Sequence, residues 1–226
     1  MKVENSTGPK QVEEPEPPPR PAARGSTDDM MQRYNRGNDG VTFPRRDDQF
    51  TPDSVYDPNS PTLDQKIAKA NLRGQLDSSG NPAWNDDKIG QVLDSGSNFG
   101  TKNYAVGDNV YKIGNASLDP NTPSPYILDQ NGMNQLVDNG YVDNSLNVTN
   151  PAGVKQYLAL PCYNMAQNVF QGQVTAPTTG VTSQINSATE LFNLDDGTGA
   201  VTEGKLLMTG GGSQVSFPPS ALSFGK

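Results

Sequence analysis

Apolar side chains are spaced differently along three stretches of the chain. From residue 1 to about 60 they occur singly among Pro, Asp, Glu and Arg, and between 61 and 100 they recur at helical spacing. After about residue 101 they fall into short runs separated by Gly, Pro and Asn. This pattern predicts an extended arm over 1–60, a short helical joint over 61–100 and a β-rich domain over 101–226.

The first stretch contains a cluster of prolines. Five of them fall within residues 15–21, with glutamates and arginines on both sides. Such a segment favours extended polyproline geometry or disorder, because it buries too little apolar surface to offset the entropy of ordering. We therefore expect residues 1–60 to become ordered against a partner surface rather than around a core of their own.

Isolated apolar side chains in the arm are candidate anchors on that partner. Residues 28–36 could form one turn of helix with Thr27 or Asp28 as N-cap, which would place two methionines and a tyrosine on one face. A solvated linker with incidental apolar residues is the alternative for this turn. The apolar side chains between residues 41 and 56 are spaced as in a chain that lies along a groove and places one side chain in each pocket. The predicted partner-binding anchors are Met30, Met31, Tyr34, Phe43, Phe50 and Tyr56.

Two helices are predicted in the joint. The first spans 60–76, because Ser60 is a good N-cap, Pro61 fits the first helical position and the apolar residues recur every three or four positions. The second spans 85–93. Trp84, the only tryptophan, precedes it and could fasten the joint to the β-rich domain.

The β-rich stretch carries short strand patterns about ten residues apart. Residues 104–106 and 110–113 predict a hairpin closed by 107–109. Residues 133–137 predict a helical turn, and 185–194 fit a helix or a strand. Further strands are predicted at 154–160, 165–174, 200–208 and 215–217. The predicted fold is mainly β, an antiparallel β-sandwich or barrel-like C-terminal domain preceded by a short helical segment and a long extended N-terminal arm.

Composition narrows the class of partner. The 226 residues have a formal net charge of −8 and no basic segment, so direct binding to nucleic acid or to an anionic membrane is not expected. No run of apolar residues reaches the length of a membrane span, and the N-terminal Met-Lys-Val-Glu-Asn lacks the apolar core of a signal peptide. We therefore expect synthesis in a cytoplasm without export.

The residue types needed for common catalytic sites are scarce. The chain has no histidine and one cysteine, Cys162, which excludes His-dependent triads and dyads, His-ligated zinc and intrachain disulfides. Cys162 fits a small buried side chain, because it has neither a histidine nor a basic neighbour to activate it.

Two loops match functional motifs only in part. Residues 195–199 read Asp-Asp-Gly-Thr-Gly, which differs from the Asp-Thr-Gly of aspartic proteases, and no second copy supplies a partner carboxylate. A hairpin turn is the better interpretation, with an incidental calcium site formed by several Asp and Asn loops as an alternative. The three glycines at 210–212 are not followed by the Gly-Lys-Ser/Thr of a phosphate loop. We expect no enzymatic activity, no catalytic residues, no metal and no cofactor.

The Pro-rich arm, helical joint and Gly/Asn/Thr-rich β domain together resemble the virion structural proteins of tailed bacteriophages, in the class of capsid decoration, cement and minor head proteins. The resemblance concerns architecture and composition, and it involves the prolines at 15–21, the segment 60–76 and the β-rich part 154–217. It implies an oligomeric β domain, with a trimer favoured. It also implies an arm that reaches across subunits of the major capsid protein or of another virion protein.

The resulting hypothesis is a non-enzymatic virion structural protein that binds and stabilises a capsid or head assembly through its N-terminal arm. Several arms on one oligomer would add avidity. The alternative is the adaptor or base of a phage fibre or adsorption module that binds host-surface carbohydrate or a fibre protein. An enzyme with two converging carboxylates is the third class. The expected location is the virion, after synthesis in the host cytoplasm.

Overall fold

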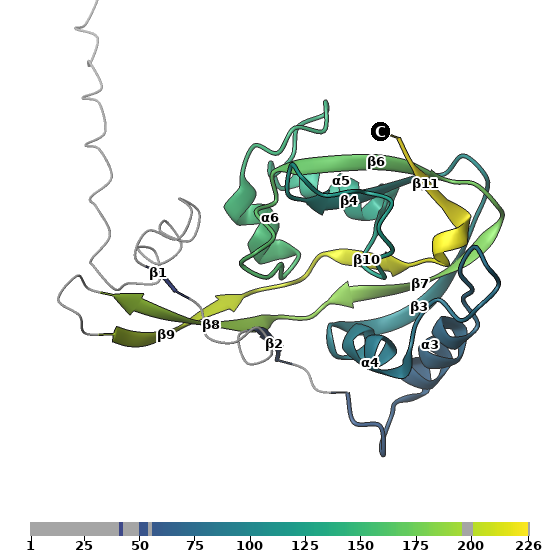
Figure 1. Ribbon diagram of the computed structural model, residues 1–226, viewed down its shortest axis with the longest axis horizontal. Coiled ribbons are helices and arrows are strands. Elements are labelled where there is room, and N and C mark those ends of the chain that lie inside the picture. The colour runs from purple at the N-terminus through teal and green to yellow at the C-terminus, as the bar shows by residue number, and fades with distance from the viewer. Residues whose placement is uncertain (1–40, 43–49, 54–55, 196–200, 226) are drawn as a thin grey trace, which may run out of the picture.

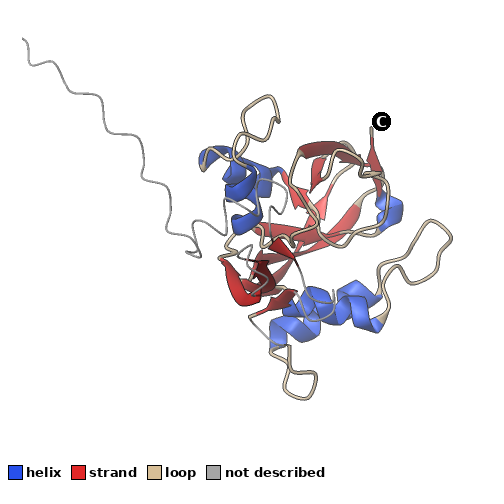
Figure 2. Ribbon diagram, turned by 60° about the vertical axis from the view of Figure 1, so that its left-hand side comes forward, coloured by secondary structure: helices blue, strands red, loops and turns tan. Residues whose placement is uncertain are grey.

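The computed structural model describes residues 41–42, 50–53, 56–195 and 201–225. Within these ranges the protein is mainly β, as predicted, with three antiparallel sheets and four α-helices (Figure 1 and Figure 2). The helices are α3 (Leu63–Arg73), α4 (Asp86–Asp94), α5 (Gln130–Asp138) and α6 (Pro151–Tyr157). None of the described helices is long and apolar enough to cross a bilayer.

Two of the sheets share a buried core. One has the strand order β10-β7-β3, formed by Ser213–Ser216, Thr178–Ile185 and Gly96–Tyr104. The other has the order β11-β6-β4-β5, formed by Leu222–Phe224, Asn168–Val174, Asn109–Gly114 and Leu128–Asp129. Buried side chains from both sheets and their connections form one cluster: Tyr104, Val110, Ile127, Val174, Val215, Phe217 and Phe224. This arrangement agrees with the predicted antiparallel sandwich.

The third sheet extends away from the other two. Strand β8 (Ala188–Asp195) pairs along its whole length with β9 (Val201–Met208). Its other edge pairs with β1 (Val41–Thr42) and β2 (Phe50–Pro52), which lie in the range predicted as the arm. Because β7 leads into β8 and β9 leads into β10, the β8–β9 ribbon projects from the body of the protein (Figure 1). Residues 188–194, for which the sequence fits a helix or a strand, are strand.

Helices α3 and α4 pack against β3 and close a second apolar cluster, which includes Leu72, Ile89 and Phe99. Helix α4 lies within one residue of the predicted range 85–93, and its N-cap is Asn85. Helix α3 begins two residues later than predicted, because Thr62 rather than Ser60 is the N-cap. Thr62 and Gln65 form a capping box, in which each side chain accepts a hydrogen bond from the other's backbone N–H.

Trp84 fastens the helical pair to the sandwich, as predicted. Its indole N–H donates to Oε1 of Gln75 at 2.6 Å, and Nε2 of Gln75 donates to the carbonyl of Ser216 in β10 at 2.9 Å. Trp84 and Gln75 are both buried. Since both polar groups of the Gln75 amide are used, this link lies in the core without an unpaired group.

Two predicted elements are wrong. Residues 151–157 form helix α6 instead of the strand predicted at 154–160, because Asn150 caps the helix and Pro151 occupies its first turn. The hairpin predicted over 104–113 does not form: β3 pairs with β7, and β4 pairs with β5 and β6. Long-range pairing therefore overrides the local turn signal, and the turn carries the chain from one sheet to the other.

Candidate functional site: a polar cleft

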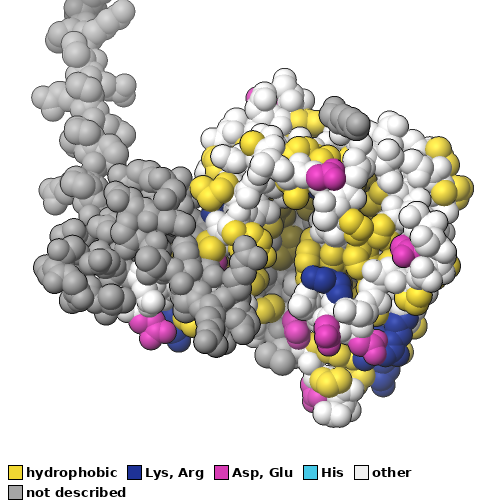
Figure 3. All heavy atoms as spheres, in the orientation of Figure 1, with side chains coloured by type: hydrophobic (Ala, Val, Ile, Leu, Met, Phe, Trp, Pro, Cys, Tyr) yellow, Lys and Arg dark blue, Asp and Glu magenta, His cyan; other side chains and the backbone are white. Residues whose placement is uncertain are grey.

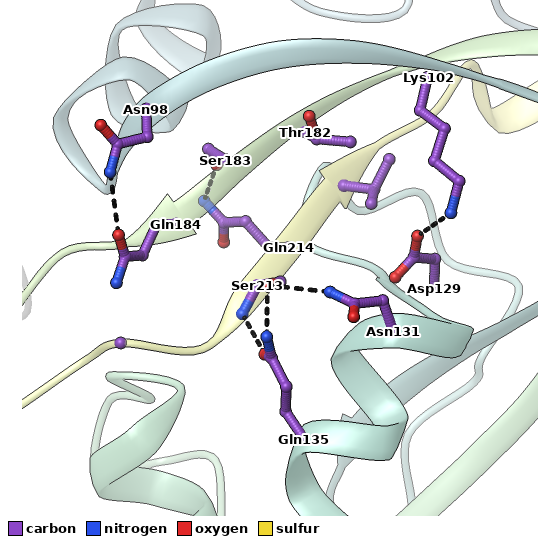
Figure 4. Close-up of a pocket in the computed structure, with 12 residues that line it drawn as sticks. Asn98, Lys102, Asp129, Asn131, Gln135, Thr182, Ser183, Gln184, Ser213 and Gln214 are labelled. Carbon is purple, nitrogen blue, oxygen red and sulfur yellow. Dashed lines mark hydrogen bonds and ion pairs between the residues drawn. The ribbon is translucent and has the colours of Figure 1, made fainter.

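A cleft of about 430 Å³ lies between the β10-β7-β3 sheet and helix α5 (Figure 4). Eight of its twelve lining residues have uncharged polar side chains, and five of those eight are amides. Val215 is the apolar member of the lining. The other lining residues are Asn98, Lys102, Asp129, Asn131, Gln135, Thr182, Ser183, Gln184, Gly211, Ser213 and Gln214.

The strand side of the cleft holds two pairs of polar side chains. Nδ2 of Asn98 in β3 donates to Oε1 of Gln184 in β7 at 2.9 Å, and both residues are exposed. Nε2 of Gln214 in β10 donates to Oγ of Ser183 in β7 at 3.1 Å, and both of these are buried. The cleft therefore has a fixed polar floor and a solvent-facing polar rim (Figure 4).

Helix α5 forms the opposite side and is bonded to the first residue of β10. Gln135 donates from Nε2 to Oγ of Ser213 at 3.0 Å and accepts at Oε1 from the Ser213 backbone N–H at 3.0 Å. Nδ2 of Asn131, one turn earlier, also donates to this hydroxyl at 3.4 Å. Because Gln135 engages both the backbone and the side chain of Ser213, the helix is held in register with the strand.

One end of the cleft is closed by Asp129, the N-cap of α5. Its Oδ1 accepts the backbone N–H of Gly132 at 3.0 Å. Its Oδ2 accepts from Nζ of Lys102 at 2.8 Å and from the hydroxyl of Tyr104 at 2.9 Å, both in β3. The carboxylate thus joins the start of a helix in one layer to a strand in the other.

Burial and hydrogen bonding act in opposite directions on Asp129. Its burial raises the pKa, but the bonds from Lys102, the Gly132 N–H and Tyr104 outweigh that effect and hold the pKa of this carboxyl below its ordinary value. For Tyr104, burial first and the Asp129 charge second raise the pKa well above that of a free phenol. At neutral pH the site therefore contains an ionised carboxylate and a neutral phenol that donates to it.

A second buried polar cluster lies away from the cleft, where α6 meets the ribbon. Nζ of Lys155 donates to the carbonyl of Cys162 at 3.4 Å, and the Cys162 N–H donates to Oε1 of Glu190 in β8 at 2.8 Å. Burial lowers the pKa of Lys155 to about 8, although Glu190 acts to raise it. Cys162 itself is buried, as predicted. This cluster connects secondary-structure elements and does not line the cleft.

The structure describes two of the six predicted arm anchors. Phe50 in β2 is partly buried against a cluster that includes Phe192 and Leu206. The backbone N–H of Tyr56 donates to Oδ1 of Asp94 at 2.6 Å. Neither residue lines the cleft, and their role as partner anchors stays a prediction. The other four lie outside the described residues: Met30, Met31, Tyr34 and Phe43.

The incidental calcium site suggested by the Asp and Asn loops has no counterpart in the described ranges. No group of three or more acidic, His or Cys side chains suited to holding a metal occurs among those residues. Residues 196–200, which contain most of the Asp-Asp-Gly-Thr-Gly loop, lie outside them. The strands on either side of that loop, β8 and β9, pair with each other, which agrees with the hairpin interpretation.

The sequence alone does not predict the polar cleft. Its amides come from positions as far apart as Asn98 and Gln214, on three strands and one helix, and no spacing along the chain relates them. Among the lining residues, only Asp129 has a local signal in the sequence. An aspartate directly before a helical pattern is a plausible N-cap, and here it accepts from the N–H of Gly132, three residues later. The site is a product of the topology.

No protein-family model matches the sequence, and no curated protein matches it. Among solved structures, one chain of "Rhs1-CT in complex with cognate immunity protein RhsI1" is similar at 15% identity and a TM-score of 0.34. The match covers 60% of this chain and 83% of that chain. Similarity at this level carries no argument about fold or function.

Replacing Asp129 with Asn tests the hydrogen-bonded carboxylate. The substitution keeps the shape and the capping oxygen but removes the charge, so the free energy of unfolding should fall by about 1–3 kcal/mol at pH 7 in urea titrations. Because the folded pKa is lowered, the Asp129 contribution is present above the ordinary carboxyl pKa and is lost as pH falls through the lowered value. The gap between wild type and D129N should therefore close in acid.

Asp138→Asn is the matched control, since Asp138 is exposed near the end of the same helix. We expect D138N to change stability by less than about 0.5 kcal/mol. A D129N deficit that stayed constant down to the lowest pH at which the protein folds would contradict the assigned role of the charge.

Proposed function

We propose that this protein is a binding module whose cleft holds a polyhydroxylated ligand, a saccharide. The observation that supports this most directly is the convergence of five side-chain amides and three hydroxyls on one cleft of about 430 Å³. A side-chain amide both donates and accepts hydrogen bonds, as a sugar hydroxyl does, so amides can satisfy a ring of hydroxyls without a net charge. The volume lies in the range of small-molecule sites.

The charges around the cleft favour an uncharged ligand. Lys102 and Asp129 are the ionisable side chains among the described lining residues, and they form an ion pair. On the face shown in Figure 3, charged side chains are sparse, and the basic group at the lower right lies beside acidic side chains. A site for a phosphate or a nucleic-acid backbone would present unpaired cations, because anions are held by excess positive charge.

A saccharide site suits the alternative that the sequence analysis raises, an adsorption module that binds host-surface carbohydrate. In that setting the virion would be the protein's location and another virion protein its partner. The capsid-stabilising hypothesis depends instead on residues 1–60, most of which lie outside the described ranges. It stays a proposal with its own test.

Binding to an array of neutral and acidic oligosaccharides tests the saccharide proposal, followed by calorimetric titration with the oligosaccharide that gives the strongest signal. Asn98→Ala and Gln184→Ala should each weaken affinity roughly 3- to 10-fold, the worth of about one hydrogen bond. Both side chains are exposed on the rim, so neither substitution leaves a cavity. Because Asn98 has a φ of 52°, a conformation that Asn tolerates better than Ala, N98A should also lower the free energy of unfolding by about 1 kcal/mol, and Gln184→Ala is the cleaner test.

Asn103→Ala is the matched control for this titration. Asn103 is also an exposed amide on β3 that is hydrogen-bonded to a β7 side chain, accepting from the Thr179 hydroxyl at 2.8 Å where Asn98 donates, but it does not line the cleft. Wild-type affinity is expected for N103A. Equal losses in N98A and N103A, or no binding to any oligosaccharide on the array, would contradict the proposal.

Deletion of residues 1–40 tests the arm hypothesis. The shortened protein keeps β1, β2 and Tyr56, which contact the body. We expect the midpoint of thermal unfolding to stay unchanged, because the described contacts are retained, and co-purification with virions to be lost. Full-length protein provides the reference in both assays. Normal incorporation of the truncated protein would count against residues 1–40 as an attachment arm.

A further inference from the structure

Strand β9 has one edge that no strand of the described residues covers. Its inner edge pairs with β8 from Val201 to Met208, and β8 in turn pairs with β1 and β2 on its far side. This edge belongs to a ribbon that projects from the body (Figure 1). An exposed row of unpaired backbone N–H and C=O groups is a template for adding another strand.

The two faces of β9 differ sharply. Leu206 and Met208 are buried on the inner face, where the ring of Phe192 lies against Gly204 so closely that a Cβ at Gly204 would collide with it. The outer face carries Glu203, Lys205 and Leu207, all exposed. Any strand added at the free edge must match this alternation, with polar positions beside polar positions.

We propose that the added strand is β9 of a second copy, paired antiparallel about a two-fold axis at Gly204. This register places Glu203 of each copy opposite Lys205 of the other, so two unlike-charge pairs form across the axis. It also places Leu207 opposite the position of Val201. The inner faces of both strands then lie on the same side, and a continuous sheet runs through both ribbons.

The neighbouring registers are less favourable. Moving the axis to position 203 or 205 brings Glu203 opposite Glu203 or Lys205 opposite Lys205, and like charges directly opposite each other repel. Placing the axis midway between two residues pairs each buried-face position of one strand with an exposed-face position of the other. Self-complementarity of this strand thus identifies one partner, a second copy, and one register. Pairing of β9 with β9 gives a dimer, whereas the resemblance to phage virion proteins favours a trimer.

Charge reversal tests the proposal in the full-length protein by analytical ultracentrifugation. We expect wild type to be a dimer, and Glu203→Lys or Lys205→Glu alone to weaken it at least about tenfold, because each replaces two attractive pairs by two repulsive ones. An equimolar mixture of E203K and K205E should form a heterodimer with pairing restored. The double variant E203K/K205E should dimerise like wild type.

These substitutions lie on exposed positions outside the cleft, so circular dichroism should be unchanged and any saccharide binding should persist. A monomeric wild type would overturn the proposal, and so would a dimer that the single reversals leave intact. Failure of the mixed singles to associate would also overturn it, since the proposed register requires that rescue. The result is independent of the proposed saccharide site.

Discussion

The Asp129 carboxylate is the interaction on which the rest of the site depends. It caps α5 through the Gly132 N–H and accepts from Lys102 and Tyr104 on β3, so a single side chain links two sheets and a helix. A buried charge is tolerated only when its lone pairs are satisfied, and here they are. Because these bonds fix the start of α5, Gln135 on this helix can bond to Ser213 of β10. The helix and the strands then form the two sides of the cleft.

Topology then decides which side chains face the cleft. Strands β3, β7 and β10 lie in one sheet although their residues are up to 120 positions apart, from Gly96 to Ser216, so amides from distant parts of the chain lie close together. All of the lining residues except Gly211 lie on strands or on α5, and the floor of the cleft is hydrogen-bonded without ligand through Gln214 and Ser183. Such preorganisation reduces the ordering cost of binding.

The sequence predicts most of what short-range physics controls, with α6 as the exception, and misses what long-range pairing controls. Helix α4 and the mainly β class follow from caps, apolar spacing and turn residues. The predicted hairpin does not form because β3 pairs over a longer stretch with β7. Helix α6 differs from the predicted strand because its apolar residues also suit a strand, although Asn150 and Pro151 mark a helix start. For the cleft, only the capping aspartate has a local signature, because the amides of Asn98 and Gln184 meet through sheet register.

A two-dimensional ¹H–¹⁵N spectrum of the side-chain amides, recorded during titration with an oligosaccharide from the array, tests most directly whether the cleft binds a saccharide. A saccharide bound in the cleft should shift the NH₂ resonances of Asn98, Gln184 and Asn131 together, with saturation at one affinity, while that of Asn103, outside the cleft, stays in place. Unchanged cleft resonances, or equal shifts at Asn103, would contradict a saccharide site between the sheet and α5.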